Sequence, residues 1–354
     1  MVSVNMRLHK NLALAIVCMT ALSCSGGHDG TGSISFTLKS VPEKSSIPNA
    51  RMDCGDVATV EVVVFDGTGA QIAHGGPWDC TSHSGALDNI PAGTSRALKV
   101  IAKDGSGEPT QWGYVKNVAV ANGQTTNIGE ITISGAGPME FVAGGCFDMG
   151  DTFGDGAPNE LPAHEVCLDG YFMDAYEMTL RRFMNNGGSG GYGCTNDIGC
   201  PVRNVSWEMA NDFCSVNGKR LPTEAEWEFA ARERGRHVRF GNGSDNIECN
   251  SANWVDCWGS ASRETLPVGS LPPNSLGLYE MSGNVFEWVW DWYDNGYYSS
   301  SPKQNPRGPD SGTKRVARGG SVFTIKDSLR ATYRNGYDPV DQFALAFSGF
   351  RCAL

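Results

Sequence analysis

The cysteines of this 354-residue chain constrain its fold more than any other feature, because ten of the twelve lie at or beyond residue 54. They divide into four local couples and one long-range couple: Cys54 with Cys80, Cys146 with Cys167, Cys194 with Cys200, Cys249 with Cys257, and Cys214 with Cys352. In an oxidising compartment such couples predict disulfides, although the sequence leaves their connectivity open. An unstrained bridge between Cys214 and Cys352 would contribute roughly 4 to 5 kcal/mol.

A metal site is the alternative use for these cysteines. Zinc sites built from cysteine usually contain a closely spaced cysteine pair. The chain has no Cys-x-x-Cys pair, and its six histidines are scattered without ligand spacing. Disulfides are therefore the favoured interpretation, and they imply that the protein leaves the cytosol.

The first residues of the chain indicate export. Arg7 and Lys10 precede an apolar run over residues 12–22 that is too short to span the roughly 30 Å hydrocarbon core of a bilayer, so residues 1–23 are predicted to be a signal peptide. The segment ALSC resembles the bacterial lipoprotein cleavage box, which predicts lipid on Cys24 and a flexible tether over residues 24–32. The protein would then be anchored in the cell envelope, at the outer membrane or on the periplasmic face. The alanine that opens this segment departs from the usual leucine, which leaves plain secretion open.

The remaining chain is long and acidic. About 330 residues remain after the signal, which is enough for two domains with separate cores. Loss of the signal's two basic residues lowers the formal charge from −11 to −13. Nucleic acid is excluded as an expected partner, because a phosphate-binding protein needs a basic face.

Residues 33–134 form the first predicted domain. Short β-branched or alternating segments are separated by Gly, Asp and Asn turns: SISFTLKSV, ATVEVVVFD, RALKVIAKD, GYVKNVAVA and TTNIGEITIS. Five or more short strands without a helix predict an antiparallel, all-β sandwich. The segment resembles the transthyretin-like or immunoglobulin-like modules of exported bacterial proteins, which implies a spacer or binding role.

Residues 138–354 form the second predicted domain, which holds most of the tryptophans and few helical stretches. Thr223 and Glu226 form a capping box at the start of a helix. A second helix is predicted from Ser206 to Gly218, and a short third one from Thr179 to Asn186. The rest is expected to be strands, turns and irregular connections, so the domain is predicted to be α+β with little regular secondary structure.

Five motifs of this second domain resemble, in order, the formylglycine-generating enzyme superfamily, also called sulfatase-modifying factors. They are FVAGGCFDMGD with LPAHEVCLDGYFMDAYEMT, PVRNVSWEMANDFCSVNGKRLPTEAEWEFAAR, LGLYEMSGNVFEWVWDWYD, RVARGGS and the terminal GFRCAL. Together they cover nearly all of residues 138–354. The resemblance implies a compact α+β fold related to C-type lectins.

The third motif contains candidate ligands for a hard cation. Glu280 and Glu287 flank a Gly-Asn turn that can direct carboxylate and carbonyl oxygens toward one ion, and calcium takes 6 to 8 oxygen ligands. The resemblance implies structural calcium at four positions, the middle two through carbonyl oxygens: Glu280, Gly283, Val285 and Glu287. A second calcium site of the family corresponds to Asn253 and the carbonyl of Trp254.

The segment RVARGGSVFTIKDSLRATYRNG bears on the reaction that the resemblance implies. Catalytic members of the family oxidise a substrate cysteine to formylglycine with oxygen, using copper held by two cysteines three and eight residues after the Ser of RGGS. Counted from Ser321, these positions hold Thr324 and Leu329. Neither offers the thiolate that monovalent copper prefers, so no catalytic residue is assigned and copper is disfavoured. Iron-binding relatives use a histidine cluster, and the added β domain offers only His74 and His83, so iron is disfavoured as well.

The segment that contains the RGGS turn has four arginines: Arg315, Arg318, Arg330 and Arg334. Pairing with acids inside the domain is the favoured expectation, because guanidinium groups bind carboxylates through two parallel hydrogen bonds. The alternative is that Arg318, Arg330 and Arg334 line a ligand cleft beside Ser321 and recognise an anion.

Three hypotheses for function follow. The preferred one is an exported lipoprotein, held at the membrane through Cys24, whose second domain is non-catalytic and binds a peptide, glycan or protein. The second is an oxidoreductase of another kind, as among the nonheme iron relatives. The third is formylglycine generation on sulfatases by an unusual site.

Overall fold

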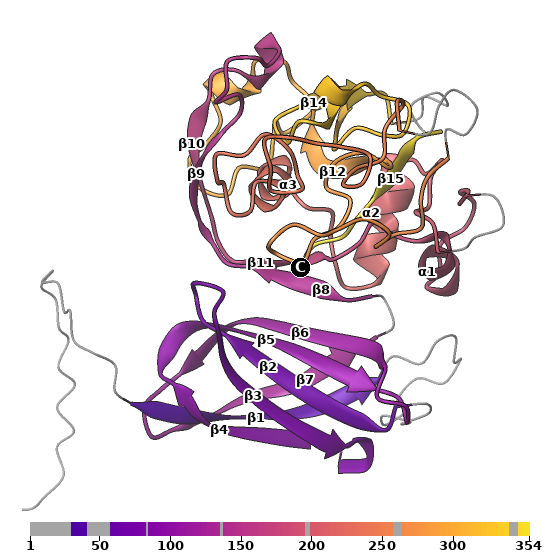
Figure 1. Ribbon diagram of the computed structural model, residues 1–354. Helices are drawn as coiled ribbons and strands as arrows, with labels where there is room; N and C mark the ends of the chain where they lie inside the picture. Colours follow the sequence, from indigo (N-terminus) through magenta and orange to yellow (C-terminus); the bar gives the residue numbers. More distant parts are fainter. Residues whose placement is uncertain are drawn as a thin grey trace, which may run out of the picture.

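The computed structural model describes residues 30–40, 57–82, 84–134, 137–194, 199–257, 264–339 and 346–354. They form an N-terminal β module, at the bottom of Figure 1, and a C-terminal mixed domain, at the top. The predicted signal peptide, Cys24 and most of the tether lie outside the described residues.

No helix among the described ranges is long and apolar enough to cross a membrane.

Seven strands in two sheets form the N-terminal module. One sheet has the strand order β4-β1-β7 and the other the order β3-β2-β5-β6. The strands are β1 Thr31–Ser40, β2 Thr59–Phe65, β3 Gln71–Asp79, β4 Ser84–Pro91, β5 Gly93–Lys103, β6 Pro109–Val120 and β7 Thr125–Ile133, with a 3₁₀ helix at Cys80–Ser82.

Alternating burial explains why these segments are strands. In β2, Val60, Val62 and Val64 are buried and the residues between them are half-buried, so every second side chain faces the core. Buried residues of both sheets belong to one hydrophobic cluster. The predicted antiparallel arrangement is wrong for one pair, because β1 and β7 run parallel. Parallel neighbours need a crossover connection instead of a hairpin, and the alternation within each strand does not show which strands become neighbours.

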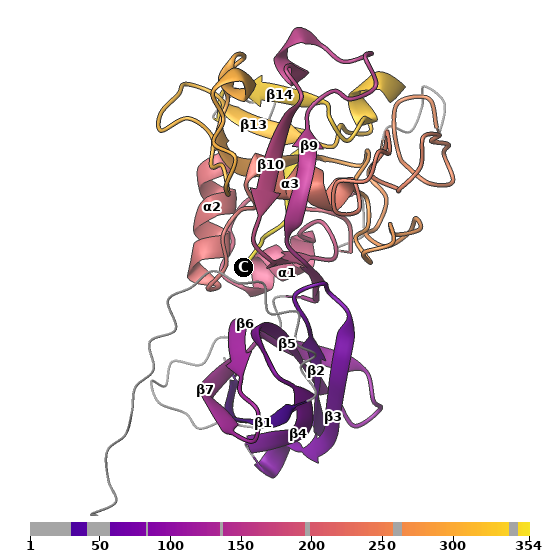
Figure 2. The same cartoon turned by 90° about the vertical axis from the view of Figure 1, so that its left-hand side faces the viewer.

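An aromatic cluster joins the module to the C-terminal domain. β8 (Met139–Val142) pairs with β11 (Tyr171–Asp174), and Phe141 and Phe172 of this pair pack with Tyr114 of β6. The Tyr114 hydroxyl accepts a hydrogen bond from the Met139 amide at 2.6 Å and donates to the Gly137 carbonyl at 3.3 Å. β6 therefore lies against the start of the second domain, and Figure 2 shows the two parts meeting along this seam.

The C-terminal domain contains short sheets and long connections. A four-stranded sheet has the order β14-β13-β12-β15, and β9 pairs with β10. These strands are β9 Gly145–Met149, β10 His164–Leu168, β12 Phe286–Trp292, β13 Arg315–Arg318, β14 Arg334–Tyr337 and β15 Ser348–Phe350. Short 3₁₀ helices occur at Pro158–Glu160, Tyr297–Ser299 and Lys326–Leu329. The predicted α+β texture with few helices is confirmed.

The three α-helices of the described chain begin where the sequence predicts. They are α1 Leu180–Asn185, α2 Trp207–Val216 and α3 Glu224–Ala231. The hydroxyls of Thr179, Ser206 and Thr223 cap them by accepting hydrogen bonds from main-chain amides of the first turn. The capping box between Thr223 and Glu226 is present. Every residue of α3 is buried, so this helix is a central element rather than an amphipathic one.

Four of the five predicted disulfides are confirmed. They join Cys146 to Cys167, Cys194 to Cys200, Cys214 to Cys352 and Cys249 to Cys257. The fifth couple involves Cys54, which lies outside the described residues. The Cys214–Cys352 bridge ties α2 to the C-terminal end of the chain.

Candidate functional site

The turn Arg318–Ser321 brings together the two positions that the family uses for copper. Gly319 and Gly320 adopt φ values of 88° and 73°, a left-handed conformation that favours glycine. A side chain at Gly320 would begin 2.7 Å from a methyl carbon of Leu329 and 3.0 Å from the Thr324 hydroxyl. The side chains of Thr324 and Leu329 therefore both lie next to Gly320 in the turn.

The chemistry at this point does not suit a soft metal. The Thr324 hydroxyl donates a hydrogen bond to the Ser321 carbonyl and accepts one from the Ser321 amide, each at 2.9 Å. Leu329 is completely buried in a cluster with Phe240 and Trp254. One hydroxyl committed to the turn and one hydrocarbon supply no thiolate or imidazole, so these residues do not fit copper.

The arginines after the turn are ion-paired inside the domain. Arg330 binds the Glu160 carboxylate with two hydrogen bonds of 2.6 and 2.8 Å, and Arg334 binds Glu224 with two of 2.7 Å. Arg318 is completely buried and donates to Glu228 at 2.6 Å. Ser321 is buried as well.

Buried guanidinium groups that already bind carboxylates are not available to a ligand from solvent. The expectation that Arg318, Ser321, Arg330 and Arg334 line a ligand cleft is therefore corrected. They are buried structural residues of the domain, and we call the arginines with their acidic partners the frame. Internal pairing with acids, the favoured expectation, holds for Arg318, Arg330 and Arg334. Arg315 departs from it, because its guanidinium donates to the Trp290 carbonyl at 2.7 Å and lies over the rings of Trp207 and Trp292.

Helix α3 supplies much of the acid in this frame. Its three glutamates are buried, and each one pairs with an arginine: Glu224 with Arg334, Glu226 with Arg220, and Glu228 with Arg318 and Arg232. The Glu224 amide donates to the Asp291 carboxylate of β12 at 2.7 Å. Burial, with Glu224 nearby, raises the pKa of Asp291 to about 8. Sequence analysis missed these acids because a helix of this composition usually turns its glutamates to solvent.

The predicted calcium residues are gathered around a buried arginine. Arg351 donates to both Glu287 oxygens at 2.7 Å, and the indole of Trp227 donates to one of them at 2.9 Å. The Glu280 carboxylate accepts from the Gly269 amide at 3.0 Å. Glu287 and Glu280 are both almost fully buried.

A third carboxylate, which sequence analysis missed, joins this group. Glu177 is completely buried and accepts hydrogen bonds from the Asn284 side chain at 2.6 Å and from the Val285 amide at 3.1 Å. The sequence signal for it was one of two acids, with Asp174, inside the mostly apolar segment YFMDAYEM. Burial, followed by the charges of Glu280 and Glu287, raises the pKa of Glu177 well above its usual value.

The second predicted calcium position belongs to the same loops. Asn253 is completely buried; its carbonyl accepts from the Asn284 amide at 2.9 Å, and its side chain donates to the Glu264 carbonyl at 3.0 Å. Gly283 has a φ of 88°, and a side chain there would begin 2.3 Å from the Asn253 carbonyl oxygen. The two predicted sites therefore lie side by side, with Trp254 buried next to them.

The donor set around Arg351 suits a hard cation. Three buried carboxylates face one guanidinium, so their ionised forms carry more negative charge than Arg351 compensates, and all the potential ligands are oxygens. Burial raises the pKa of Glu280 to about 7, as expected for an acid whose negative charge is poorly compensated. Among the described residues, the oxygens of these three carboxylates do not all lie within 4.8 Å of one another.

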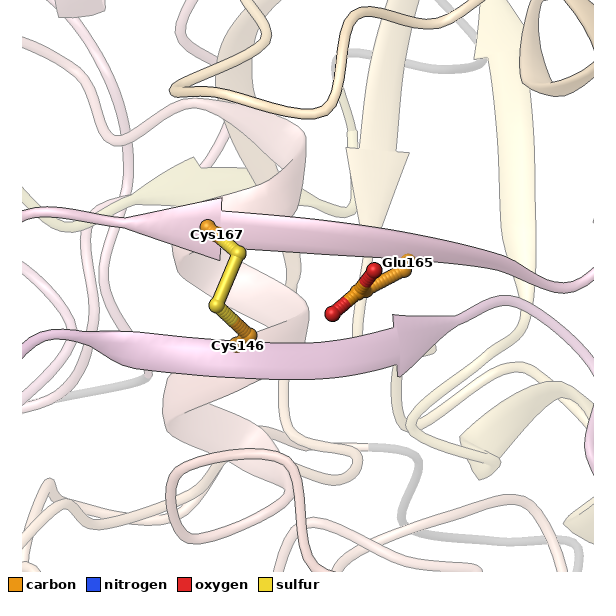
Figure 3. A group of neighbouring side chains, drawn as sticks. All are labelled: Cys146, Glu165 and Cys167. Carbon is orange, nitrogen blue, oxygen red and sulfur yellow. A yellow bond between two sulfur atoms is a disulfide. The ribbon is translucent and has the colours of Figure 1, made fainter.

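Other metal ligands are sparse in the described chain. The single group of three potential ligands within 4.8 Å is Cys146, Glu165 and Cys167. Figure 3 shows that the two sulfurs of this group are bonded to each other across β9 and β10, so they are not free to bind a metal. His74 has a ring nitrogen 3.5 Å from Glu61, and His83 lies outside the described residues.

Comparison with known proteins identifies the C-terminal domain. Residues 135–354 match the model of the sulfatase-modifying factor enzyme 1-like domain. The chain belongs to this family. As a sulfatase-modifying-factor protein it is 36% identical over 242 residues to the serine/threonine-protein kinase Pkn1 of Chlamydia trachomatis, covering 61% of this chain and 38% of that relative. The chain thus spans well under half the length of this relative.

Two further relatives are covered almost completely. The formylglycine-generating enzyme of Streptomyces coelicolor is 32% identical over 279 residues, which cover 60% of this chain and 87% of that enzyme. Among solved structures, the Treponema denticola variable protein 1 aligns with a TM-score of 0.53 at 26% identity, covering 61% of this chain and 94% of the other. These likenesses support the family fold predicted for residues 138–354.

Proposed function

We propose that this sulfatase-modifying-factor protein is an exported lipoprotein whose C-terminal domain lacks the copper oxidase reaction and binds a peptide, glycan or protein. Lipid on Cys24 would hold it at the membrane of the cell envelope. The β module, which we take to be a transthyretin-like or immunoglobulin-like sandwich, would act as spacer or as part of the binding surface. The observation that carries the proposal is the pair Thr324 and Leu329 beside the RGGS turn.

The missing donors bear directly on the reaction. Conversion of a thiol to an aldehyde with oxygen needs a centre that binds the thiolate and activates oxygen, and copper supplies this chemistry in catalytic relatives. Here the Thr324 hydroxyl is bound within the turn and Leu329 fills the adjacent space. In this proposal the RGGS turn and its buried ion pairs are retained, and the two thiolates that would bind copper are absent.

Copper binding tests the proposal by gain of function. We expect the wild-type protein to bind no stoichiometric Cu(I) in a competition titration against a chromophoric chelator. The double variant Thr324→Cys/Leu329→Cys restores two thiols at one point and is expected to bind one Cu(I), because soft thiolates select it. The single variant Thr324→Cys is the matched control, with weaker binding expected. Tight stoichiometric binding of Cu(I) by the wild type would refute the proposal.

We further propose a structural calcium ion at the carboxylates around Arg351. Glu177, Glu280 and Glu287 would supply side-chain oxygens, and Gly283 and Val285 would supply carbonyls. The second ion would use Asn253 and Trp254. Calcium would compensate the excess negative charge of the buried group and hold its loops together.

Calcium should therefore raise the thermal stability in a pH-dependent way. At 100 times its dissociation constant, an ion adds about 2.7 kcal/mol, which predicts a rise in Tm of roughly 5 °C or more at pH 7.5 over the protein in EDTA. The carboxyl of Glu280 has a pKa of about 7 in the fold against 4.5 when unfolded, so between these values the folded protein holds more protons and, without calcium, loses stability as the pH rises. Calcium binds the ionised form, so its effect should shrink toward pH 5.

The controls are two single substitutions. Glu280→Gln should lose most of the calcium effect, whereas Glu165→Gln, on the exposed side of β10, should retain it. Scanning calorimetry measures both. Identical Tm values in calcium and in EDTA at pH 7.5 would contradict the calcium site.

A further inference from the structure

A cavity of about 180 Å³ lies at the seam between the β module and the C-terminal domain. We call it the seam cavity and define it by its charged and aromatic walls: Lys116, Asp169, Arg220, Glu226, Trp290 and Arg307. Lys116 comes from β6 of the module, and the other five come from the C-terminal domain. The cavity therefore exists only because the two parts of the chain meet.

Two of its cations have no carboxylate partner. The ammonium group of half-buried Lys116 makes no hydrogen bond or ion pair with any residue that the structure describes. The guanidinium of Arg307 lies over the ring of Trp290 at 4.9 Å and has no ion pair within the described ranges. The third cation, Arg220, is already bound to Glu226 by two hydrogen bonds of 2.6 Å.

The acids of the cavity make no ion pair with these two cations, and the charges of Glu226 and Asp169 offset only part of what lowers the pKa of Lys116. Glu226 is committed to Arg220 and to the Thr223 amide, at 2.8 Å. Asp169 is exposed and accepts a hydrogen bond from Asn305 at 3.1 Å. Burial and the nearby charge of Arg220 lower the pKa of Lys116, so this ammonium lacks stabilisation in the free protein. An anion bound in the cavity would stabilise the ammonium form of Lys116.

A second cavity, of about 350 Å³, continues the first along the seam. The two share four wall residues: Lys116, Leu168, Asp169 and Gly170. The second is also lined by polar groups of the module, Ser95, Arg96 and Asn117. The guanidinium of Arg96 is bound to the Pro91 and Ala92 carbonyls, so the added space is polar without a further free charge.

We propose that the seam cavity binds the oxyanion group, a carboxylate, sulfate or phosphate, of a small polar ligand, with Lys116 and Arg307 as its charged contacts. The second cavity takes the body of a ligand larger than an inorganic ion. This inference rests on the binding role proposed above. It places that role at the seam and uses neither the Ser321 turn nor the residues at 324 and 329.

Isothermal titration of the exported chain, residues 24–354, tests the site with three probes: inorganic phosphate, sulfate and glucuronate. Saturable binding that weakens with salt is expected for at least one probe. Lys116→Gln and Arg307→Gln should each weaken it about tenfold or more, because each removes a charge-assisted hydrogen bond. Tighter binding of glucuronate than of phosphate identifies an acidic sugar as the source of the oxyanion. Equal or weaker binding of glucuronate identifies a free inorganic anion.

The matched control is Lys103→Gln, which removes the same charge from the module but pairs with Glu61 away from both cavities. It should bind like the wild type, and unchanged melting curves would show that all variants fold. The proposal is overturned if no probe binds saturably, or if Lys103→Gln weakens binding as much as Lys116→Gln. Either failure would leave the absence of oxidase chemistry standing, since that is measured by copper binding and aldehyde formation.

Discussion

Arg351→Met is expected to lower the free energy of unfolding by about 3 to 5 kcal/mol at pH 7, measured in EDTA. The guanidinium is completely buried, and it neutralises Glu287 while Glu177 and Glu280 remain nearby. It also donates to the Asp174, Ala175 and Tyr279 carbonyls at 2.7 to 3.2 Å. Methionine fills part of the space but leaves the buried carboxylates uncompensated. Urea unfolding followed by tryptophan fluorescence measures the loss.

The pH dependence separates this charge effect from a packing effect. Without the guanidinium, the folded pKa values of Glu177 and Glu280 rise further, so protonation at pH 5 should recover part of the lost stability. The control Arg236→Met changes an exposed arginine that pairs with Glu233, and it should cost at most about 1 kcal/mol. A loss below 1 kcal/mol for Arg351→Met, or the same loss at pH 5 and pH 7, would contradict the account of this cluster.

Removal of the long-range disulfide is the second large effect. Cys214→Ala/Cys352→Ala opens a bridge across a sequence separation of 138 residues, and the chain-entropy account predicts a loss of roughly 4 to 5 kcal/mol. Both cysteines are completely buried, so the bridge is also part of the packing between α2 and the C-terminal segment. Urea unfolding under non-reducing conditions measures the difference.

The short bridge provides the comparison. Cys249→Ala/Cys257→Ala opens a separation of 8 residues, for which the same account predicts about 2.5 kcal/mol. The long-range variant should therefore lose clearly more stability than the short-range one. Equal losses for the two double variants would argue against loop entropy as the main source of the stabilisation.

Local chemistry explains which features the sequence could predict. Helix caps at Thr179, Ser206 and Thr223 depend on residues three positions apart, and the sequence contains the whole motif. The cysteine couples with short separations are likewise local. The strands of the module follow from alternation within each segment, as β2 illustrates.

Tertiary chemistry explains what the sequence could not predict. The Arg330–Glu160 pair joins residues 170 positions apart, and nothing near either residue indicates the other. Glu177 is one of two acids in a mostly apolar segment, and only the fold places it beside Asn284. The parallel pairing of β1 with β7 and the position of Lys116 in a cavity lined by the second domain also depend on how separate segments pack.

The candidate site contains both features that are local in the sequence and features that depend on tertiary packing. The positions of Thr324 and Leu329 relative to Ser321 follow from counting along the chain, and the structure then places both beside Gly320. The roles of the surrounding arginines depended on acids that lie elsewhere in the sequence. The sequence therefore favoured internal pairing but could not name the partners or exclude the cleft, whereas the lack of soft ligands at residues 324 and 329 can be read directly from it.

Aldehyde formation on a cysteine-containing sulfatase-type peptide tests the central claim most directly. Residues 24–354 would be incubated with the peptide, copper and oxygen. The aldehyde would be quantified by mass spectrometry after capture with a hydrazide, beside a catalytic relative as positive control. The account predicts no aldehyde above the level of copper alone. Catalytic turnover of the peptide by the wild-type protein would contradict it.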